Sequence, residues 1–221
     1  MLQNLHRSGN RPQWKEVPAI ERNRWQKLAA RTNGILTPAN VVTGLGLWLV
    51  WGGLTDFKSG DRFKGIIKMT IGYGCDVGDG AVAELTGTKS PLGEVLDAGA
   101  DKLRAAASLL TLTSSGDIPT PAAQIMGARA VAMTGFTALA RSQGVNTHSD
   151  LAGKHATFAE STAIMLYAGA TIAHESGHDE VAPWLARAGH LAVGAVVAKG
   201  VEGIVAMART SFVNRAAENS L

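Results

Sequence analysis

The chain has 221 residues, of which 46% are hydrophobic and 18% charged, and its formal net charge is +3. This length predicts one domain, and a single cysteine, Cys75, excludes an internal disulfide. The mean hydropathy of +0.07 is low for a protein with several membrane spans. However, the charged residues cluster between apolar segments rich in Ala and Gly, and small residues let transmembrane helices approach closely. The distribution of charge therefore predicts an all-α membrane protein.

The N-terminal arm, residues 1–35, is polar and basic, with seven Lys and Arg against two acidic residues. It lacks the central apolar run of a signal peptide. Apolar and basic residues are mixed from Ile20 to Arg31, which predicts a short amphipathic helix at the membrane interface, although a solvated helical arm fits the same pattern. Because an apolar segment follows directly, we expect the arm to contact anionic lipid head groups rather than nucleic acid.

Six apolar segments follow and predict a bundle of six transmembrane helices over residues 36–212, with a cytoplasmic tail over 213–221. Pro38 after Thr37 is typical of a helix start. Each apolar run is shorter or more broken than the roughly 20 residues that a straight span needs. The expected spans are 36–54, 65–75 with a continuation into the acidic stretch that follows, 93–112, 122–141, 155–173 and 183–212, with a loop over 84–92.

The Lys and Arg residues near the helix ends predict the orientation in the membrane. The arm, the loops 84–93 and 142–154 and the tail contain most of them, whereas the loops 113–118 and 174–182 contain none. The turn 55–64, with three basic residues, is the exception. Both termini, and the acidic stretch that follows the second apolar run, are therefore predicted to face the cytoplasm at the cell membrane.

Four aspartates mark the stretch from residue 76 to residue 101. Asp76 and Asp79 are three residues apart, and Asp97 and Asp101 are four apart, so each pair shares one face of a helix. Two such helices side by side would gather four carboxylates, which repel one another and are costly to desolvate. A set of oxygen ligands suits hard divalent ions such as Mg²⁺ or Mn²⁺, so the stretch predicts a metal site.

The same stretch resembles the signature of the CDP-alcohol phosphatidyltransferases, D-x-x-D-G-x-x-A-R, eight residues, G-x-x-x-D-x-x-x-D. Seven of its eight defining positions match at the right spacing, and the exception is Glu84, where the family has Arg. The matching residues besides the aspartates are Gly80, Ala83 and Gly93.

The resemblance implies displacement of CMP from a CDP-activated lipid, CDP-diacylglycerol, by a small alcohol. It implies that Asp76, Asp79 and Asp97 are ligands of two divalent ions, and that Asp101 is the general base and shares in metal binding. Such ions would clamp the diphosphate and stabilise the leaving CMP. Close approach of the nucleotide is implied for Gly80, Ala83 and Gly93, and Thr43 is a weaker candidate in the same pocket.

Three cations point to the acceptor. Arg129, Arg141 and Lys154 flank the cytoplasmic halves of the fourth and fifth predicted spans. Cations at such positions are typical of functional sites, and Arg binds phosphate with two hydrogen bonds. They favour a phosphorylated acceptor, such as glycerol 3-phosphate or inositol phosphate, although each could instead be an ordinary interfacial residue. Small residues in the sixth span, among them Gly194, Gly200 and Gly203, fit a homodimer or packing within one bundle.

Glu84 reverses a charge close to an anionic nucleotide. It predicts a salt bridge with Lys89 or with Arg104, an altered donor, or a relative that has lost catalysis. We expect retained chemistry, because an Arg in such a helix often serves only packing.

A second motif suggests another function. The run His174-Glu175-Ser176-Gly177-His178 matches H-E-x-x-H, which on a helix places two imidazoles for zinc and a general base, with Glu202 as a third ligand, as in a membrane zinc metalloprotease. No Asp-Gly pair follows it, although the intramembrane proteases that it resembles require one. The run also lies between two predicted spans, so we expect a polar loop.

Overall fold

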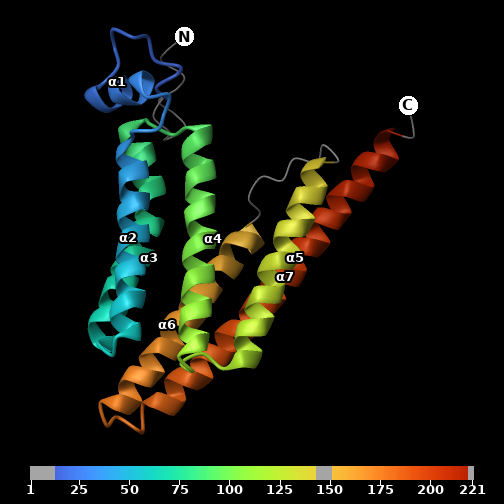
Figure 1. Cartoon of the computed structure of the whole chain (residues 1–221). Coiled ribbons are helices and arrows are strands. Elements are labelled where there is room, and N and C mark those ends of the chain that lie inside the picture. Colours follow the sequence, from blue (N-terminus) through green and yellow to red (C-terminus); the bar gives the residue numbers. More distant parts are fainter. Residues whose placement is uncertain (1–12, 143–150, 219–221) are drawn as a thin grey trace. The chain divides into compact units, whose positions relative to one another are not determined.

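The computed structural model describes residues 13–142 and 151–218 (Figure 1). Over these residues the chain is helical and contains no strand, which confirms the predicted all-α class. One short helix precedes six long ones, in the order that the apolar segments predict. The described helices are α1 (Arg24–Arg31), α2 (Pro38–Lys58), α3 (Arg62–Thr86), α4 (Pro91–Ser114), α5 (Thr120–Ser142), α6 (Leu151–Glu175) and α7 (Ala182–Glu218).

Several helix ends differ from the sequence prediction, and the differences matter most at the expected loop 84–92 and at the expected tail. The expected loop over 84–92 is shorter, because α3 continues through Glu84 to Thr86 and α4 begins at Pro91. The residue that ends α3 is Gly87, whose φ of 67° is the left-handed conformation that a helix C-cap uses. At the other end of the chain, α7 extends to Glu218, so residues 213–218 of the expected tail continue the last helix.

The chain folds as two units, residues 1–107 and residues 108–221. In the first unit, α2 and α3 form a hairpin in which the backbones touch at glycine pairs. A Cβ on Gly46 would lie 2.8 Å from the carbonyl oxygen of Gly72, and one on Gly53 would lie 2.6 Å from that of Gly65. Larger side chains at these positions would force the helices apart, so the glycines set the close α2–α3 packing that small residues favour in membrane helices.

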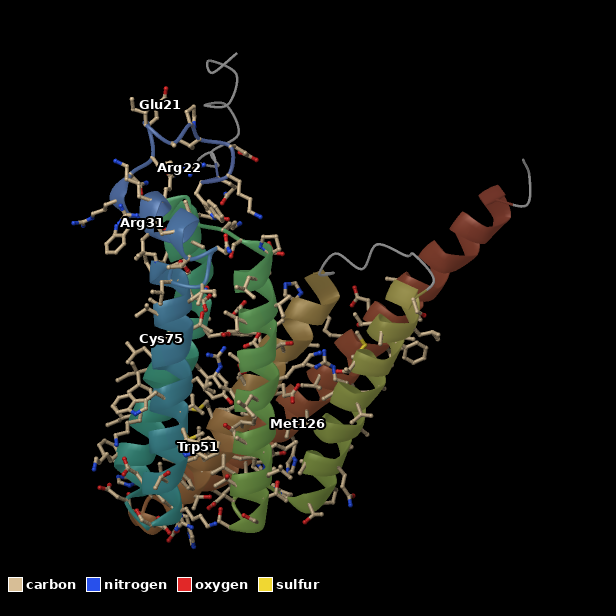
Figure 2. All side chains as sticks on the ribbon, turned by 45° about the horizontal axis from the view of Figure 1, so that its top comes forward. Glu21, Arg22, Arg31, Trp51, Cys75 and Met126 are labelled. Atoms are coloured by element: carbon tan, nitrogen blue, oxygen red, sulfur yellow. The ribbon has the colours of Figure 1, made fainter. Side chains whose placement is uncertain are left out.

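The described part of the N-terminal arm, which includes Arg22 and Arg31 (Figure 2), is bonded to the C-terminal end of α3. Asn23 accepts hydrogen bonds from the first turn of α1 in a capping box. The backbone N–H of Trp14 donates to the carbonyl of Gly87 at 3.1 Å, and the Asn23 side chain donates to that of Thr86 at 3.2 Å. These bonds satisfy carbonyls that a helix end leaves free, so the described part of the arm supports the link between α3 and α4.

Polar and apolar residues are distributed unusually in the first unit. Thr43, Asp79 and Arg104 are buried, whereas α2 exposes a row of large apolar residues. This row comprises Val41, Leu45, Trp48 and Trp51, the last of which is labelled in Figure 2. A polar interior behind an apolar outer face is the arrangement expected where the solvent is lipid.

Among the described helices, one stretch, Ala182–Ala206 of α7, is long and apolar enough by its composition alone to cross a membrane. The prediction of six spans therefore stays a prediction.

The second unit contains α5, α6 and α7. Helices α6 and α7 form a hairpin in which the hydroxyl of Tyr167 lies 2.7 Å from Nδ1 of His190. Arg129 of α5 forms an ion pair with Glu160 of α6. The side chain of Arg129 also packs on α7, because a Cβ on Gly200 would lie 3.1 Å from its Cγ. Arg129 therefore contacts both other helices of this unit.

Candidate active site

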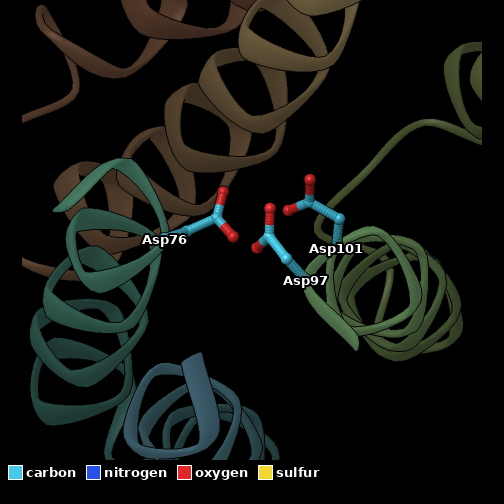
Figure 3. Close-up of side chains that lie close together, drawn as sticks. All are labelled: Asp76, Asp97 and Asp101. Atoms are coloured by element: carbon cyan, nitrogen blue, oxygen red, sulfur yellow. The ribbon is translucent and has the colours of Figure 1, made fainter. Parts of the chain in front are cut away.

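Three carboxylates meet in the first unit. Asp76 comes from α3, and Asp97 and Asp101 come from successive turns of α4 (Figure 3). One oxygen from each lies within 4.8 Å of the others. The Oδ1 atom of Asp97 is buried and has no hydrogen-bond partner within the described part of the chain. Buried carboxylate oxygens need a positive or protonic partner, and oxygen ligands at this spacing fit a divalent ion such as Mg²⁺ or Mn²⁺.

Asp79 lies outside that group of three and is held by α2. It is buried, and its Oδ2 accepts a hydrogen bond of 2.5 Å from the hydroxyl of Thr43. Asp79 nevertheless lines the same hollow as Asp97. The structure thus brings three of the four predicted aspartates together and places the fourth beside them, with one oxygen engaged by a neighbouring helix.

A hollow next to the carboxylates collects the residues predicted to bind the nucleotide. Its lining includes Thr43, Gly80, Ala83 and Gly93. A Cβ on Gly93 would lie 3.1 Å from Oδ1 of Asn40, whereas one on Gly80 would meet no described atom within 4 Å. A side chain at Gly93 would therefore press on Asn40 and Ser90, whereas Gly80 borders open space. The other polar lining residues are Asn40, Thr88, Lys89, Ser90 and Glu94, and Lys89 is one of the two partners that the sequence analysis gave to Glu84. The sequence analysis did not point to Thr88, Ser90 or Glu94 as members of a site.

Arg104 belongs to the carboxylate site, although the sequence analysis considered it only as a partner of Glu84. Its side chain is completely buried, and its Nη2 contacts Oδ1 of Asp76 and lies 2.9 Å from Oδ1 of Asp101. Arg104 follows Asp101 by three residues, so the helical spacing could have indicated this contact. The alternative in which Arg104 pairs with Glu84 is wrong, because its buried guanidinium is directed to the aspartates.

Glu84 pairs with Lys89, which was the other predicted alternative. The Lys89 ammonium lies 2.7 Å from the Glu84 carboxylate, and both side chains are exposed. Lys89 also lines the hollow. The ion pair therefore connects Glu84, which departs from the family signature, to the predicted nucleotide site.

The predicted acceptor cations belong to the second unit. Arg129 donates from Nη1 to Glu160 at 3.1 Å, and the two side chains are only 13% and 6% exposed. The sequence analysis did not single out Glu160. Arg141 and Lys154 lie on α5 and α6, and their side chains are outside the described part of the structure.

The second motif does not form the geometry of a zinc site. Helix α6 ends at Glu175, and Gly177, with a φ of 77°, reverses the chain before His178. The two imidazoles therefore do not lie one turn apart on a single helix, in agreement with the predicted loop. His174 instead contacts Asp179 at 2.7 Å, and Glu202 pairs with Lys199 at 2.6 Å.

A comparison with protein families identifies the chain. The family model of the CDP-alcohol phosphatidyltransferases matches residues 36–198. The chain belongs to this family. CDP-alcohol phosphatidyltransferases are membrane-associated transferases of phospholipid biosynthesis that move a phosphatidyl group from a CDP-alcohol to an acceptor, and they typically depend on divalent metal. No curated protein and no solved structure matched the chain.

Proposed function

We propose that this phosphatidyltransferase transfers the phosphatidyl group of CDP-diacylglycerol to a small phosphorylated alcohol and releases CMP. The observation that carries the proposal is the meeting of Asp76, Asp97 and Asp101 beside a hollow lined by the signature residues Gly80 and Gly93. A diphosphate donor needs a binding site and, next to it, cations that neutralise its charge. The hollow supports the first requirement, and the carboxylates, as ligands of divalent ions, support the second.

Four carboxylates are available to hold divalent ions. Asp76, Asp97 and Asp101 fit one ion by their spacing, and Asp79 beside them would supply a ligand for a second. When bound, two ions of Mg²⁺ or Mn²⁺ would neutralise the diphosphate and stabilise the departing CMP. The chain itself contributes the positions of these oxygens from two helices, and the Thr43 hydroxyl orients Asp79.

Asp101 is the proposed general base. Its Oδ1 is held by Arg104, which orients the carboxylate. The acceptor hydroxyl transfers its proton to Asp101 as its oxygen forms a bond to the phosphorus of the phosphatidyl group. The bond from that phosphorus to the bridging oxygen breaks, and CMP leaves with the electron pair. The hollow at Thr43, Gly80, Ala83 and Gly93 binds the cytidine nucleotide.

We further propose that α2 to α7 span the cell membrane and that both termini and the site face the cytoplasm. The exposed apolar row on α2 and the buried polar residues behind it support this orientation to lipid. Thr43 lies near the start of α2 and Asp79 near the end of α3. The site is therefore at the same end of the hairpin as the basic N-terminal arm, which suits contact with anionic lipid.

The acceptor is proposed to carry a phosphate that Arg129, Arg141 and Lys154 bind. The proposal rests on their chemistry and on their positions in the second unit. The pairing of Arg129 with Glu160 sets its geometry and reduces its net charge. A homodimer through α7 is also proposed. Gly194 supports it, because a Cβ there would meet no described atom within 4 Å, whereas Gly200 serves packing against Arg129 within the chain.

The test is CMP release by the detergent-purified protein with CDP-diacylglycerol and Mg²⁺ or Mn²⁺. Glycerol 3-phosphate, inositol phosphate, inositol and serine are supplied separately. We expect release with one phosphorylated acceptor and loss of release in Asp97→Asn and Asp101→Asn. Asp56→Asn is the matched control, because Asp56 pairs with Lys68 away from the hollow. Binding of the CDP-lipid without release by the wild type would contradict the proposal and indicate a non-catalytic relative.

A further inference from the structure

We propose that Arg104 is a resident cation of the carboxylate site, which bridges Asp76 and Asp101 without metal and with which a divalent ion competes. The inference rests on the proposed metal site and adds to it a residue that the family signature does not contain. The signature ends at Asp101, three residues before Arg104.

Within the described residues, both ion pairs of the guanidinium are with proposed metal ligands. Nη2 of Arg104 contacts Oδ1 of Asp76 and Oδ1 of Asp101. Its Nε and Nη1 atoms are buried without a hydrogen-bond acceptor in the described residues. The position of this charge therefore depends on two carboxylates, each of which has only two oxygens to share with a metal ion.

The surroundings of Arg104 hold it in place. The side chain has no exposed surface. A Cβ on Gly46 would lie 3.2 Å from its Nη1 and 3.0 Å from the Cβ of Cys75, so the guanidinium fits against the glycine contact between α2 and α3. A completely buried charge is costly unless it is paired. The guanidinium thus joins α4 to α3 through charge, close to where a bridging metal ion would do the same.

The balance of charge leads to competition. Four carboxylates provide four negative charges, and Arg104 already offsets one of them at short range. A divalent ion placed on Asp76 and Asp101 would be repelled by the guanidinium in a medium that screens charge weakly. Arg104 should therefore lower the affinity for metal and at the same time stabilise the site in its absence.

A purely structural ion pair makes the opposite prediction. If Arg104 only held α3 and α4 together, its removal would loosen the site, and metal would bind more weakly. If Arg104 competes with metal, its removal would leave the carboxylates free, and metal would bind more tightly. The direction of the change in Mn²⁺ affinity distinguishes the two roles.

The experiment measures Mn²⁺ binding by titration calorimetry on the detergent-purified full chain. We expect Arg104→Met to bind Mn²⁺ at least about tenfold more tightly than the wild type, and Arg104→Lys, which keeps the charge, to stay within about threefold. Lys102→Met is the matched control, because it removes one positive charge from an exposed position on the same helix. Screening by solvent should keep its change in affinity below about twofold.

Thermal unfolding gives a second, independent measurement. In EDTA we expect Arg104→Met to melt at a lower temperature than the wild type. Addition of Mn²⁺ should raise the melting temperature of the variant and so remove this difference. Equal or weaker Mn²⁺ binding by Arg104→Met would overturn the inference. If that variant does not fold, the wild type is measured in EDTA instead. It should stay folded there, because Arg104 stabilises the site without metal. Unfolding of the wild type in EDTA would show that Arg104 does not hold the site. Absence of Mn²⁺ binding by the wild type would instead reject the proposed metal site itself.

Discussion

The hydroxyl of Thr43 on α2 lies 2.5 Å from Oδ2 of Asp79 on α3, and both side chains are buried. This hydrogen bond connects the first helix of the predicted bundle to the carboxylate signature. It explains why Asp79 stands apart from the three aspartates that cluster, and it assigns Thr43 to the orientation of a carboxylate as well as to the wall of the hollow.

Removal of the Thr43 hydroxyl should destabilise the protein. In Thr43→Val the shape of the side chain is kept, but Asp79 loses its buried hydrogen-bond donor. We expect a loss of about 1–3 kcal/mol of stability, measured by thermal unfolding in detergent. Thr43→Ser restores the hydroxyl and should recover most of the loss. Equal melting temperatures for all three proteins would show that Asp79 finds another donor.

Gly80 should separate stability from nucleotide binding. A Cβ at this position meets no described atom within 4 Å, and Ala favours helix more than Gly by up to about 1 kcal/mol. We expect Gly80→Ala to fold at least as stably as the wild type. Because Gly80 lines the hollow, the new methyl group should weaken CMP binding by about tenfold, measured by calorimetry in the presence of Mg²⁺.

Gly78 provides the matched control for that variant. It lies on the same helix, a Cβ there also meets no described atom within 4 Å, and it does not line the hollow. Gly78→Ala should show the same change in melting temperature and no change in CMP affinity. A similar loss of CMP binding in both variants would place the nucleotide elsewhere on α3.

Glu84 should prove to be a tolerated departure from the family signature. Its pair with Lys89 is exposed, and exposed ion pairs contribute little. We expect Glu84→Gln to leave the melting temperature unchanged and to keep the rate of CMP release within about threefold of the wild type. A loss of release would show that Glu84 is needed to hold Lys89 at the hollow, whereas a large gain would indicate that Glu84 suppresses catalysis.

The Arg129–Glu160 pair should respond differently to single and double substitution. Arg129→Met leaves a buried carboxylate without its partner, and we expect a loss of about 3–5 kcal/mol. The double variant Arg129→Met with Glu160→Met removes both charges and should recover most of this stability in thermal unfolding.

The same double variant tests whether Arg129 also binds the acceptor phosphate. If it does, the folded double variant should show a KM for that acceptor raised roughly tenfold. An unchanged KM would restrict Arg129 to a structural role.

Local patterns in the sequence were sufficient for much of this protein. The spacing of Asp97 and Asp101 placed them on one face of a helix, the apolar runs predicted six long helices in the right order, and the signature led to the family that the comparison with family models confirms. These features depend on helical periodicity and on residue types close together in the chain. The main local error was the end of α3, where Gly87 rather than residue 84 ends the helix.

The partners of individual charges depended on tertiary structure. Both Lys89 and Arg104 were available to Glu84 in the sequence, and the fold gives Lys89 to Glu84 and Arg104 to Asp76 and Asp101. Likewise, Thr43 meets Asp79, and Arg129 meets Glu160, across helices that are far apart in the chain. Periodicity states which residues share a face of one helix, but which faces meet follows from packing, here from glycines that let α2 and α3 touch.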